Sequence, residues 1–313
     1  MIKLFNINDY TVNTSNFSNK INDLCVLEFE KKFANFVGAK YACGFSSATN
    51  AIFLTFINKK VHVKVPSMIP TVVLNALVHG NNDFSFSDNV DWVGNSYVLH
   101  EFKDYKVIDS AQKVEKNQFK KEANDKDLMI FSFYPTKPVG SIDGGMIVSN
   151  DLEKITWFRR AVMNGTGIET NSWDRKIYFP GWKMYLNSFQ AYVANENFKL
   201  LEMKQEKLKK IREEYNNVFN INNTSNHLYR IDVKDRDLFV DAMKEKKIVT
   251  GIHYKPAHEI EVYKNISKNN KNLYQTEKKG KTTVSIPFHE CLTENEVKYV
   301  IDSCLETGLV IKD

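Results

Sequence analysis

The first half of the chain alternates short apolar segments with segments of helical periodicity, and this alternation restricts the fold more than any other feature. The apolar segments are short, rich in β-branched or aromatic residues and bounded by turn residues, so they are predicted to be strands. Strands that alternate with helices form a sheet covered by helices on both faces. We therefore predict an α/β fold with a mainly parallel sheet. The predicted strands are 41–45, 62–65, 83–87, 97–100, 106–109, 128–133 and 145–149.

A long helical pattern runs from about residue 187 to 218, and the pattern changes after residue 222. The later elements are a strand at 227–233, a helix at 235–246, a strand at 249–254 and a helix at 294–307. Such a set is typical of a small α+β domain. A chain of 313 residues is long enough for two domains. We expect a large domain at 1–215 and a small C-terminal domain at 216–313.

The composition narrows the class of protein. Hydrophobic residues make up 42% and charged residues 26%, and no apolar run approaches membrane-spanning length. The net charge of +5 comes largely from lysine-rich stretches at 204–210 and 264–281, which we interpret as solvated surfaces rather than a nucleic-acid site. The four cysteines form no C-x-x-C pair, so neither a zinc site nor a disulfide framework is indicated. We expect a cytoplasmic protein with reduced thiols and neither a membrane nor a nucleic-acid partner.

Residues 46–50, Ser-Ser-Ala-Thr-Asn, lie between a predicted strand and a predicted apolar helix. Small residues at a helix N-terminus let backbone N–H groups approach an anion closely, and the helix dipole favours its negative charge. The hydroxyl of Thr49 would add a donor. The same residues would also serve as an ordinary helix cap, which is the commoner role. This segment alone leaves a phosphate site and a simple cap both open.

Asp109 is predicted to end an apolar strand and so to lie at the carboxyl edge of the sheet, where ligands bind in α/β folds. A carboxylate in that place can keep the nitrogen of a bound pyridine ring protonated, which makes the ring an electron sink. Aspartate is also a favoured N-cap, and the Ser-Ala-Gln that follows is suited to start a turn. The two roles fit Asp109 equally well.

Lys137 follows an aromatic strand and precedes a Gly-Gly loop that leads into another apolar strand. Most lysines are surface residues, but this setting indicates a buried environment. Burial lowers the pKa of a lysine and makes its amine nucleophilic. Ser132, at the end of the strand, would add a hydroxyl to a phosphate site. Lys183, in a Pro-Gly turn before the long helical pattern, is either a solvated charge or a phosphate contact.

Six short motifs occur in an order and spacing that is far more specific than any one of them. Together they resemble the DegT/DnrJ/StrS family, the sugar aminotransferases among the fold-type I enzymes that use pyridoxal 5'-phosphate (PLP). The similarity extends from about residue 25 to the C-terminus. The motifs are Glu30 to Gly38 (E-x-x-F-A-x-x-x-G), Ser47-Ala48-Thr49, Asp109-Ser-Ala-Gln112, Ser132 to Lys137 with Gly144-Gly145, Gly181-Trp-Lys183 with Gln190-Ala191, and His227-Leu-Tyr229 with Gly251 to His258.

The resemblance implies an architecture of the aspartate-aminotransferase type, in which a seven-stranded sheet lies between helices and a small domain follows. It implies that Lys137 binds the cofactor aldehyde as a Schiff base and later transfers a proton as general acid and base. Asp109 would pair with the pyridine nitrogen, and Gln112 would lie near the ring hydroxyl. The phosphate would be held by Ala48, Thr49 and Ser132, and by Lys183 from the neighbouring subunit of a homodimer with shared active sites.

The resemblance also implies two half-reactions. An amino donor such as glutamate would convert PLP to pyridoxamine phosphate, and a keto-sugar, nucleotide-linked in most of the family, would then take the amine for surface-polysaccharide synthesis. Candidates for substrate contact, which packing or a subunit interface would explain as well, are Tyr134, Trp182, Tyr185, His253 and His258. The two histidines are five residues apart at a strand end and do not share a face, so we expect no metal site.

The chain departs from the family in three places. Pro70 stands where the family usually has an aromatic residue stacked on the cofactor ring. The stretch between Asp83 and Asp109 is shorter than usual, and the N-terminal segment lacks the usual substrate loop, which leaves room for a different substrate. The alternatives are a PLP-dependent sugar dehydratase, an aminotransferase of a small keto-phosphate, and a non-catalytic regulator or scaffold. Lysine rather than histidine at position 137 favours transamination over dehydration.

Overall fold

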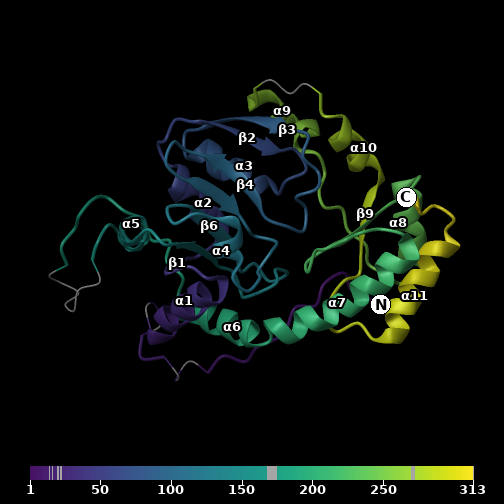
Figure 1. Cartoon of the computed structure of the whole chain (residues 1–313), viewed down its shortest axis with the longest axis horizontal. Coiled ribbons are helices and arrows are strands. Elements are labelled where there is room, and N and C mark those ends of the chain that lie inside the picture. The colour runs from purple at the N-terminus through teal and green to yellow at the C-terminus, as the bar shows by residue number, and fades with distance from the viewer. Residues whose placement is uncertain are drawn as a thin grey trace.

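The computed structural model describes residues 1–13, 15, 17–19, 21, 23–167, 175–268 and 272–312. They form a larger body around a central sheet and a smaller body beside it (Figure 1). The elements up to residue 199 are α1 (Leu24–Val37), β1 (Tyr41–Phe45), α2 (Ala48–Phe56), β2 (His62–Pro66), α3 (Thr71–His79), β3 (Asp83–Ser87), β4 (Tyr97–Glu101), β5 (Lys106–Asp109), α4 (Gln118–Glu122), β6 (Leu128–Ser132), β7 (Gly145–Ser149), α5 (Leu152–Val162) and α6 (Ser188–Lys199). They are followed by α7 (Leu201–Phe219), β8 (Tyr229–Asp232), α8 (Arg236–Glu245), a 3₁₀ turn (Ala257–Glu259), α9 (Glu261–Ile266), α10 (Tyr274–Thr282), β9 (Thr283–Ile286) and α11 (Glu294–Glu306).

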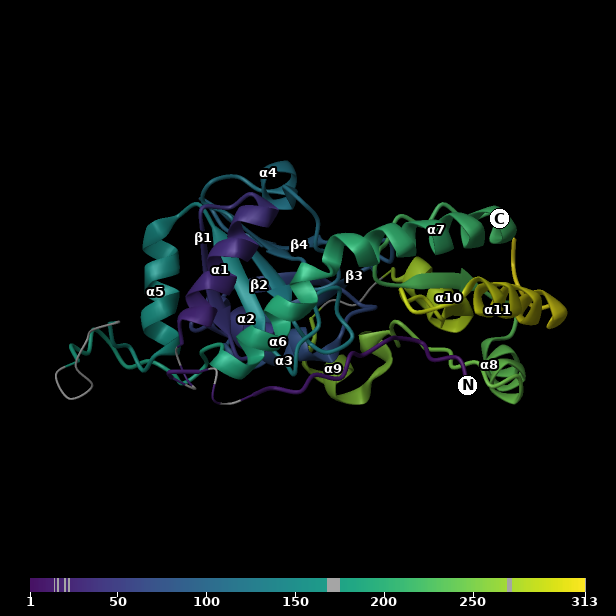
Figure 2. The ribbon, with the colours of Figure 1, turned by 90° about the horizontal axis from the view of Figure 1, so that it is seen from below.

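The long helix α7 joins the two bodies. Figure 2 shows it running from the end of α6 beside the larger body to the far end of the smaller one. The sequence predicted one helix from about 187 to 218, and the structure divides it at Leu200 into α6 and α7. Asn187 and Gln190 cap the start of α6 reciprocally, because each side chain bonds to the backbone of the other residue.

Five strands form the central sheet in the order β1-β7-β6-β5-β4. β5 and β6 are parallel, whereas β7 is antiparallel to both β1 and β6, and β4 is antiparallel to β5. β2 and β3 form a separate parallel pair, and β2 packs beside β4. All seven predicted strands of this region are therefore present, but five of them form a mixed sheet and the other two a separate parallel pair, rather than one mainly parallel, seven-stranded sheet.

The direction of β4 follows from the length of its connection to β5. Only residues 102–105 join the two strands, and the Phe102 backbone N–H donates to the Tyr105 carbonyl at 2.9 Å. So short a connection permits a hairpin, whereas a parallel neighbour needs a crossover of about a dozen residues or more. The short connection thus makes β4 antiparallel to β5 and places Tyr97 directly opposite Asp109.

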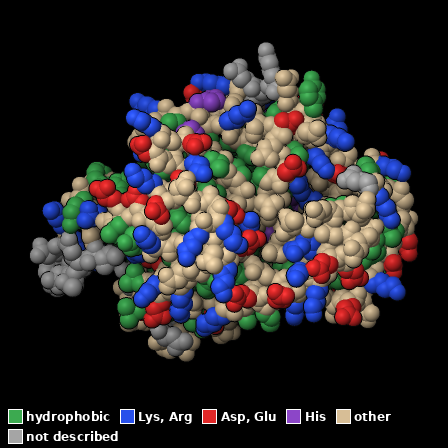
Figure 3. Space-filling model, viewed as in Figure 1, with side chains coloured by type: hydrophobic (Ala, Val, Ile, Leu, Met, Phe, Trp, Pro, Cys, Tyr) green, Lys and Arg blue, Asp and Glu red, His purple; other side chains and the backbone are tan. Residues whose placement is uncertain are grey.

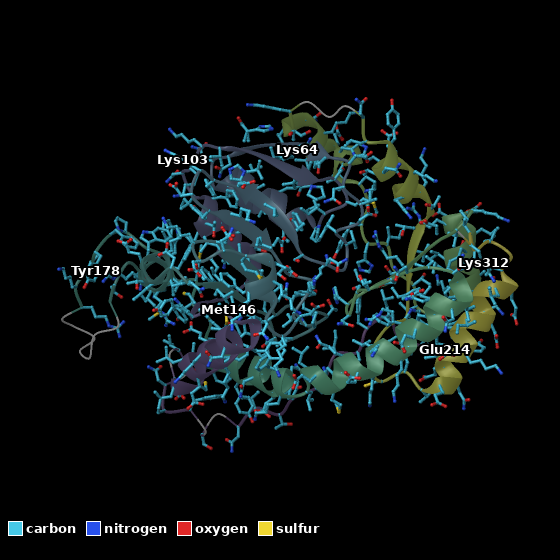
Figure 4. All side chains as sticks on the ribbon, viewed as in Figure 1. Lys64, Lys103, Met146, Tyr178, Glu214 and Lys312 are labelled. Atoms are coloured by element: carbon cyan, nitrogen blue, oxygen red, sulfur yellow. The ribbon has the colours of Figure 1, made fainter. Side chains whose placement is uncertain are left out.

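Helices cover both faces of the central sheet, as predicted. Along β6, Leu128 and Ile130 join one apolar core with α2, α3 and α5, while Met129 and Phe131 join another with α1, α4 and α6. Figure 4 places Met146, in β7, inside the larger body. The two cores hold the strand ends in place, and those ends carry the candidate site.

A third apolar core fills the smaller body. It combines β8, β9, α8 and α11 with the C-terminal half of α7, whose Tyr215 and Phe219 are fully buried. The strand predicted at 249–254 is reduced to a single bridge between Gly251 and Ser285. We propose that this core marks the small α+β domain expected at 216–313, with α7 shared between the two domains.

The surface carries both signs of charge, and Lys and Arg side chains are interspersed with Asp and Glu on the face shown in Figure 3. Within the described ranges, no helix combines the length and apolar character needed to cross a bilayer. The same residues hold no group of three His, Cys, Asp or Glu side chains placed to share a metal ion.

Candidate active site

A cavity of about 530 Å³ lies at the carboxyl ends of β5 and β6. Asp109 ends β5, Ser132 ends β6, and both line the cavity. Ligands bind at this edge of the sheet in folds of this class. The cavity also takes in the starts of α2 and α3, the turn that carries Lys137, and a C-terminal stretch with His253 and Tyr254.

Lys137 lies in the tight turn that follows β6. Its backbone N–H donates to the Tyr134 carbonyl at 2.9 Å, and the turn closes at Gly140, where a Cβ would lie 2.3 Å from the Pro135 carbonyl oxygen. Burial lowers the pKa of the Lys137 amine to about 8, and the charge of Asp109 opposes this shift. An amine with this pKa is partly neutral near neutral pH, so it is able to attack a carbonyl carbon.

Asp109 is buried and held by two hydrogen-bond donors. Its Oδ1 accepts the Ala111 backbone N–H at 2.9 Å, and its Oδ2 accepts the Tyr97 hydroxyl at 3.0 Å. Burial raises the pKa of the Asp109 carboxyl, while the two hydrogen bonds and the charge of Lys137 act in the opposite direction. The residues that follow form a turn and not a helix, so the alternative role of N-cap does not apply.

The N-terminus of α2 opens onto the same cavity. The predicted cap is formed, because the Ser47 side chain accepts a backbone N–H of the first turn at 3.2 Å. Ala48 and Thr49 line the cavity together with Ser132. Gly145, the first residue of β7, lets the helix start pack against the sheet, since a Cβ there would lie 2.4 Å from the Ala48 nitrogen. The first backbone N–H groups of a helix have no partner within the helix, so this cap is compatible with a bound anion.

Gln112 is buried beside the cavity, and both ends of its amide are engaged. Its Oε1 accepts the Gly94 backbone N–H at 2.7 Å, and its Nε2 donates to the Tyr254 hydroxyl at 2.9 Å. Tyr254 in turn stacks on Trp92, with ring centroids 6.3 Å apart and planes 8° from parallel. Gln112 therefore ties the turn after β5 to two other segments, and its predicted place near a cofactor hydroxyl stays a prediction.

The predicted substrate residues are not all at the cavity. Tyr134 and His253 line it, and Tyr134 is 55% exposed. His258 instead bonds through Nδ1 to the hydroxyl of Ser67 at 2.7 Å and lies outside the lining. Within this single chain His258 therefore serves local packing, the alternative that the sequence had left open.

Trp182, Lys183 and Tyr185 belong to an arm, residues 163–185, that leaves the larger body after α5; its described parts are 163–167 and 175–185. Trp182 packs edge-on against an aromatic residue of α2, and Tyr185 forms a bridge to the end of β1. None of the three lines the cavity of its own chain. Figure 4 labels Tyr178 farther out along this arm. Contacts of the arm with a second subunit stay predictions.

Two histidines flank Lys137. Burial, together with the charges of Lys137 and His253, holds the pKa of His227 well below its usual range. Burial and the Lys137 charge likewise lower the pKa of His253 to about 4. Both imidazoles are therefore neutral at physiological pH. His253 is one of the predicted substrate residues, whereas the motif that contains His227 implies no role for its side chain.

Phe5, Trp92 and Tyr97 also surround the site, and no sequence motif had marked them. Phe5 comes from the N-terminal segment and packs on both flanking histidines. A second cavity, of about 380 Å³, meets the first at Lys137 and Phe5 and is bounded by the N-terminal segment and α7. Only the folded chain brings these distant segments to the same lysine.

Comparison with known proteins gives a match over most of the chain. The model of the DegT/DnrJ/EryC1/StrS aminotransferase family matches residues 13–83 and 107–305. The UDP-4-amino-4,6-dideoxy-N-acetyl-beta-L-altrosamine transaminase of Campylobacter jejuni strain 81-176 is 26% identical, with 88% of each chain covered. The spore coat polysaccharide biosynthesis protein SpsC of Bacillus subtilis is 23% identical over 89% of this chain and 88% of its own.

Solved structures share the fold. The aminotransferase TlmJ from Streptoalloteichus hindustanus superposes with a TM-score of 0.80 at 18% identity, covering 97% of each chain. Helicobacter pylori PseC, an aminotransferase involved in the biosynthesis of pseudoaminic acid, gives a TM-score of 0.78 at 18% identity over 97% of this chain and 98% of its own. At such identities the likeness concerns the fold, and it confirms the predicted α/β class.

Proposed function

Because this chain belongs to the DegT/DnrJ/EryC1/StrS aminotransferase family, as its motifs predicted, we propose that it transfers an amino group from glutamate to a nucleotide-linked keto-sugar. The family consists of PLP-dependent aminotransferases, so the reaction class follows from membership. The donor, the acceptor and the residue roles are our proposal. One observation supports it above all: the Lys137 amine, the buried Asp109 carboxylate and the N-terminus of α2 face a single cavity.

The residues around this cavity fit PLP in three respects. The start of α2 offers backbone N–H groups to a phosphate, with hydroxyls from Thr49 and Ser132 on the same wall. Asp109 is a buried carboxylate without a cationic side chain in hydrogen-bond contact among the described residues, which suits a protonated ring nitrogen. Lys137 presents an amine of lowered pKa to the aldehyde. We propose that these residues hold the cofactor.

When bound, PLP would supply an electron sink that stabilises negative charge on the substrate carbon. Asp109 would keep the ring nitrogen protonated, because two fixed donors hold its carboxylate in one orientation. Lys137 would carry a proton from one substrate atom to the next, and a pKa of about 8 suits that exchange near neutral pH. His227 and His253 are neutral and add no positive charge beside the amine.

The proposed acceptor is supported by two kinds of observation. The C. jejuni relative is named as a transaminase of a UDP-linked amino sugar, and SpsC is named for polysaccharide biosynthesis. In addition, the second cavity meets the first at Lys137 and offers space for the part of a large substrate that does not react. A product for surface-polysaccharide synthesis follows from this acceptor.

We also propose a homodimer in which Lys183 contacts the cofactor phosphate of the partner chain. The arm that carries Lys183 exposes apolar side chains, with Ile177 70% and Tyr178 39% exposed. Exposed apolar residues on a projecting segment are typical of an interface. The four free cysteines suit a reducing compartment, so we place the protein in the cytoplasm.

The test begins with the purified protein. We expect a visible absorption band from bound PLP, and borohydride should fix the cofactor to Lys137, as located by mass spectrometry of the digested protein. Lys113→Met removes a half-buried lysine that pairs with Glu122 away from the cavity, so it should leave the band intact. A colourless protein that takes up no PLP would exclude the proposal.

Product analysis then separates the reactions. A panel of nucleotide-linked keto-sugars with glutamate should yield an amino sugar, and 2-oxoglutarate should appear in equal amount. Loss of oxygen from the sugar without gain of nitrogen would instead support the dehydratase alternative. Turnover of a small keto-phosphate but of no keto-sugar would support the other alternative. A Lys137→Ala variant that keeps its biological activity would support a regulator.

A further inference from the structure

The stretch from residue 84 to 106 is the internal part of the chain that the family match passes over. It nevertheless reaches the site. Trp92 lines the main cavity, Gly94 bonds to Gln112, and Tyr97 bonds to Asp109. Family membership therefore assigns no role to this stretch, although three of its residues contact the site.

Tyr97 contacts the residue that is proposed to face the cofactor ring nitrogen. It begins β4 and lies opposite Asp109 in the β4–β5 hairpin, and its hydroxyl donates to Asp109 Oδ2 at 3.0 Å. Burial and the adjacent Asp109 charge raise the pKa of Tyr97 well above its usual value. The hydroxyl therefore keeps its proton at every working pH and remains a donor.

The surrounding contacts hold the Tyr97 ring in place. Trp92 packs on the Tyr97 ring, with ring centroids 4.6 Å apart. Trp92 also stacks on Tyr254. Tyr254 accepts the Gln112 amide, and Gln112 accepts the Gly94 N–H. The loop before β4 is thus tied to the turn after β5 directly by the Gly94–Gln112 hydrogen bond, and indirectly through Tyr254, which stacks on Trp92 and bonds to Gln112. The donor to Asp109 is held in position by packing and not only by its own bond.

We propose that Tyr97 is a positioning residue: by donating to Asp109 it fixes the carboxylate that holds the ring nitrogen of PLP. This inference rests on the proposed function. The Ala111 N–H fixes one carboxylate oxygen and Tyr97 fixes the other, so both donors favour the ionised form. An ionised, oriented carboxylate binds a protonated pyridine nitrogen more tightly than a carboxylate that has lost one of its donors. The short hairpin provides this donor, because it pairs β4 antiparallel to β5 with Tyr97 opposite Asp109.

Tyr97→Phe tests this directly, because it removes one oxygen and keeps the ring that packs on Trp92. The full-length protein is freed of cofactor and titrated with PLP or with its carbocyclic analogue, in which a benzene ring replaces the pyridine. We expect the variant to bind PLP about tenfold more weakly, which corresponds to about 1.4 kcal/mol. Affinity for the analogue should change less than twofold, since the analogue has no ring nitrogen to contact Asp109.

Tyr215→Phe is the matched control. Tyr215 is buried, as Tyr97 is, and its hydroxyl donates to the Pro287 carbonyl at 3.0 Å in the smaller body. This variant should bind both compounds as the wild type does. In an Asp109→Asn background, Tyr97→Phe should no longer distinguish PLP from the analogue, because the two changes act on one interaction. Tyr97→His keeps a ring N–H donor, so it should recover part of the preference for PLP over the analogue. This variant replaces Tyr97→Phe in the test if the phenylalanine variant does not fold.

The outcomes separate this inference from the proposed function. Equal weakening of PLP and the analogue, or no weakening of either, would overturn the role of Tyr97 while leaving the aminotransferase assignment in place. A wild-type protein that binds PLP no better than the analogue would overturn the role of Asp109, and that of Tyr97 with it. A wild-type protein that binds neither compound would remove the proposed function itself.

Discussion

Gly145→Ala should damage the phosphate end of the site through a steric effect that the structure allows us to work out. Gly145 begins β7, and an added Cβ would lie 2.4 Å from the Ala48 nitrogen and 2.6 Å from its Cα. Ordinary contact begins near 3.4 Å, so the start of α2 must move by about 1 Å. Both neighbours are backbone atoms, which no rotamer change relieves. The backbone angles of Gly145 are open to alanine, so the clash alone is tested.

Overpacking of this kind costs about 1–3 kcal/mol of folding stability. A displacement of about 1 Å also spoils the hydrogen bonds that the start of α2 would give to a phosphate. Loss of one charge-assisted hydrogen bond costs about 2 kcal/mol, or roughly 30-fold in affinity. We therefore expect PLP to bind roughly 30-fold more weakly to Gly145→Ala. Pyridoxal, which lacks the phosphate, should bind nearly as it does to the wild type.

The assay is a fluorescence titration of each compound, with the melting temperature measured in parallel. Gly308→Ala is the control, because its φ of +64° strains an alanine while no atom lies within 4 Å of the added Cβ. It should lose about 1 kcal/mol of stability and keep its PLP affinity. Unchanged PLP affinity in Gly145→Ala, or equal loss for PLP and pyridoxal, would refute the placement of the phosphate at α2.

Three further predictions test other parts of the site and its support. The rate of PLP attachment should rise with pH through about 8, because the lowered pKa of Lys137 leaves more neutral amine above that value; a stopped-flow pH series that is flat from pH 6 to 9 would contradict this. Glu30→Gln should cost about 3 kcal/mol in urea unfolding while PLP affinity holds, since Glu30 is buried against Arg159 and does not line the cavity; a loss below 1 kcal/mol would count against a buried pair. Lys183→Ala should weaken PLP binding in the dimer by about tenfold, with Lys176→Ala as a control on the same arm; equal effects in calorimetry would rule out a specific phosphate contact.

The sequence was sufficient for the parts of the site that lie within one motif. Asp109 and Ser132 end the apolar strands β5 and β6, which are parallel, so both residues reach the edge of the sheet at which ligands bind in α/β folds. Lys137 follows the second of these strands by a turn that its own glycine and prolines shape. Such local patterns made the α/β class and the aminotransferase family predictable.

Other expectations depended on partners that no local pattern names. Trp182, Tyr185 and His258 were candidates for substrate contact because of their type and motif, yet in this chain they pack against other segments. Tyr97 and Trp92 were not candidates, because their role depends on which residues lie opposite them. A motif gives the type of a residue and its neighbours in the sequence, but not the residues that it contacts in the folded chain.

The sequence by itself determined the alternating elements, the strand ends that bear Asp109 and Ser132, and the lysine that follows. These depend on apolar periodicity and turn residues, which act over a few residues. Only the tertiary structure decided the direction of β4 and the pairing of Tyr97 with Asp109, and it brought His227 and Phe5 to Lys137. Those features arise from the chain length between strands and from the packing of distant segments. The contacts between distant segments, and the free energy that they contribute, exist only once the whole chain has folded.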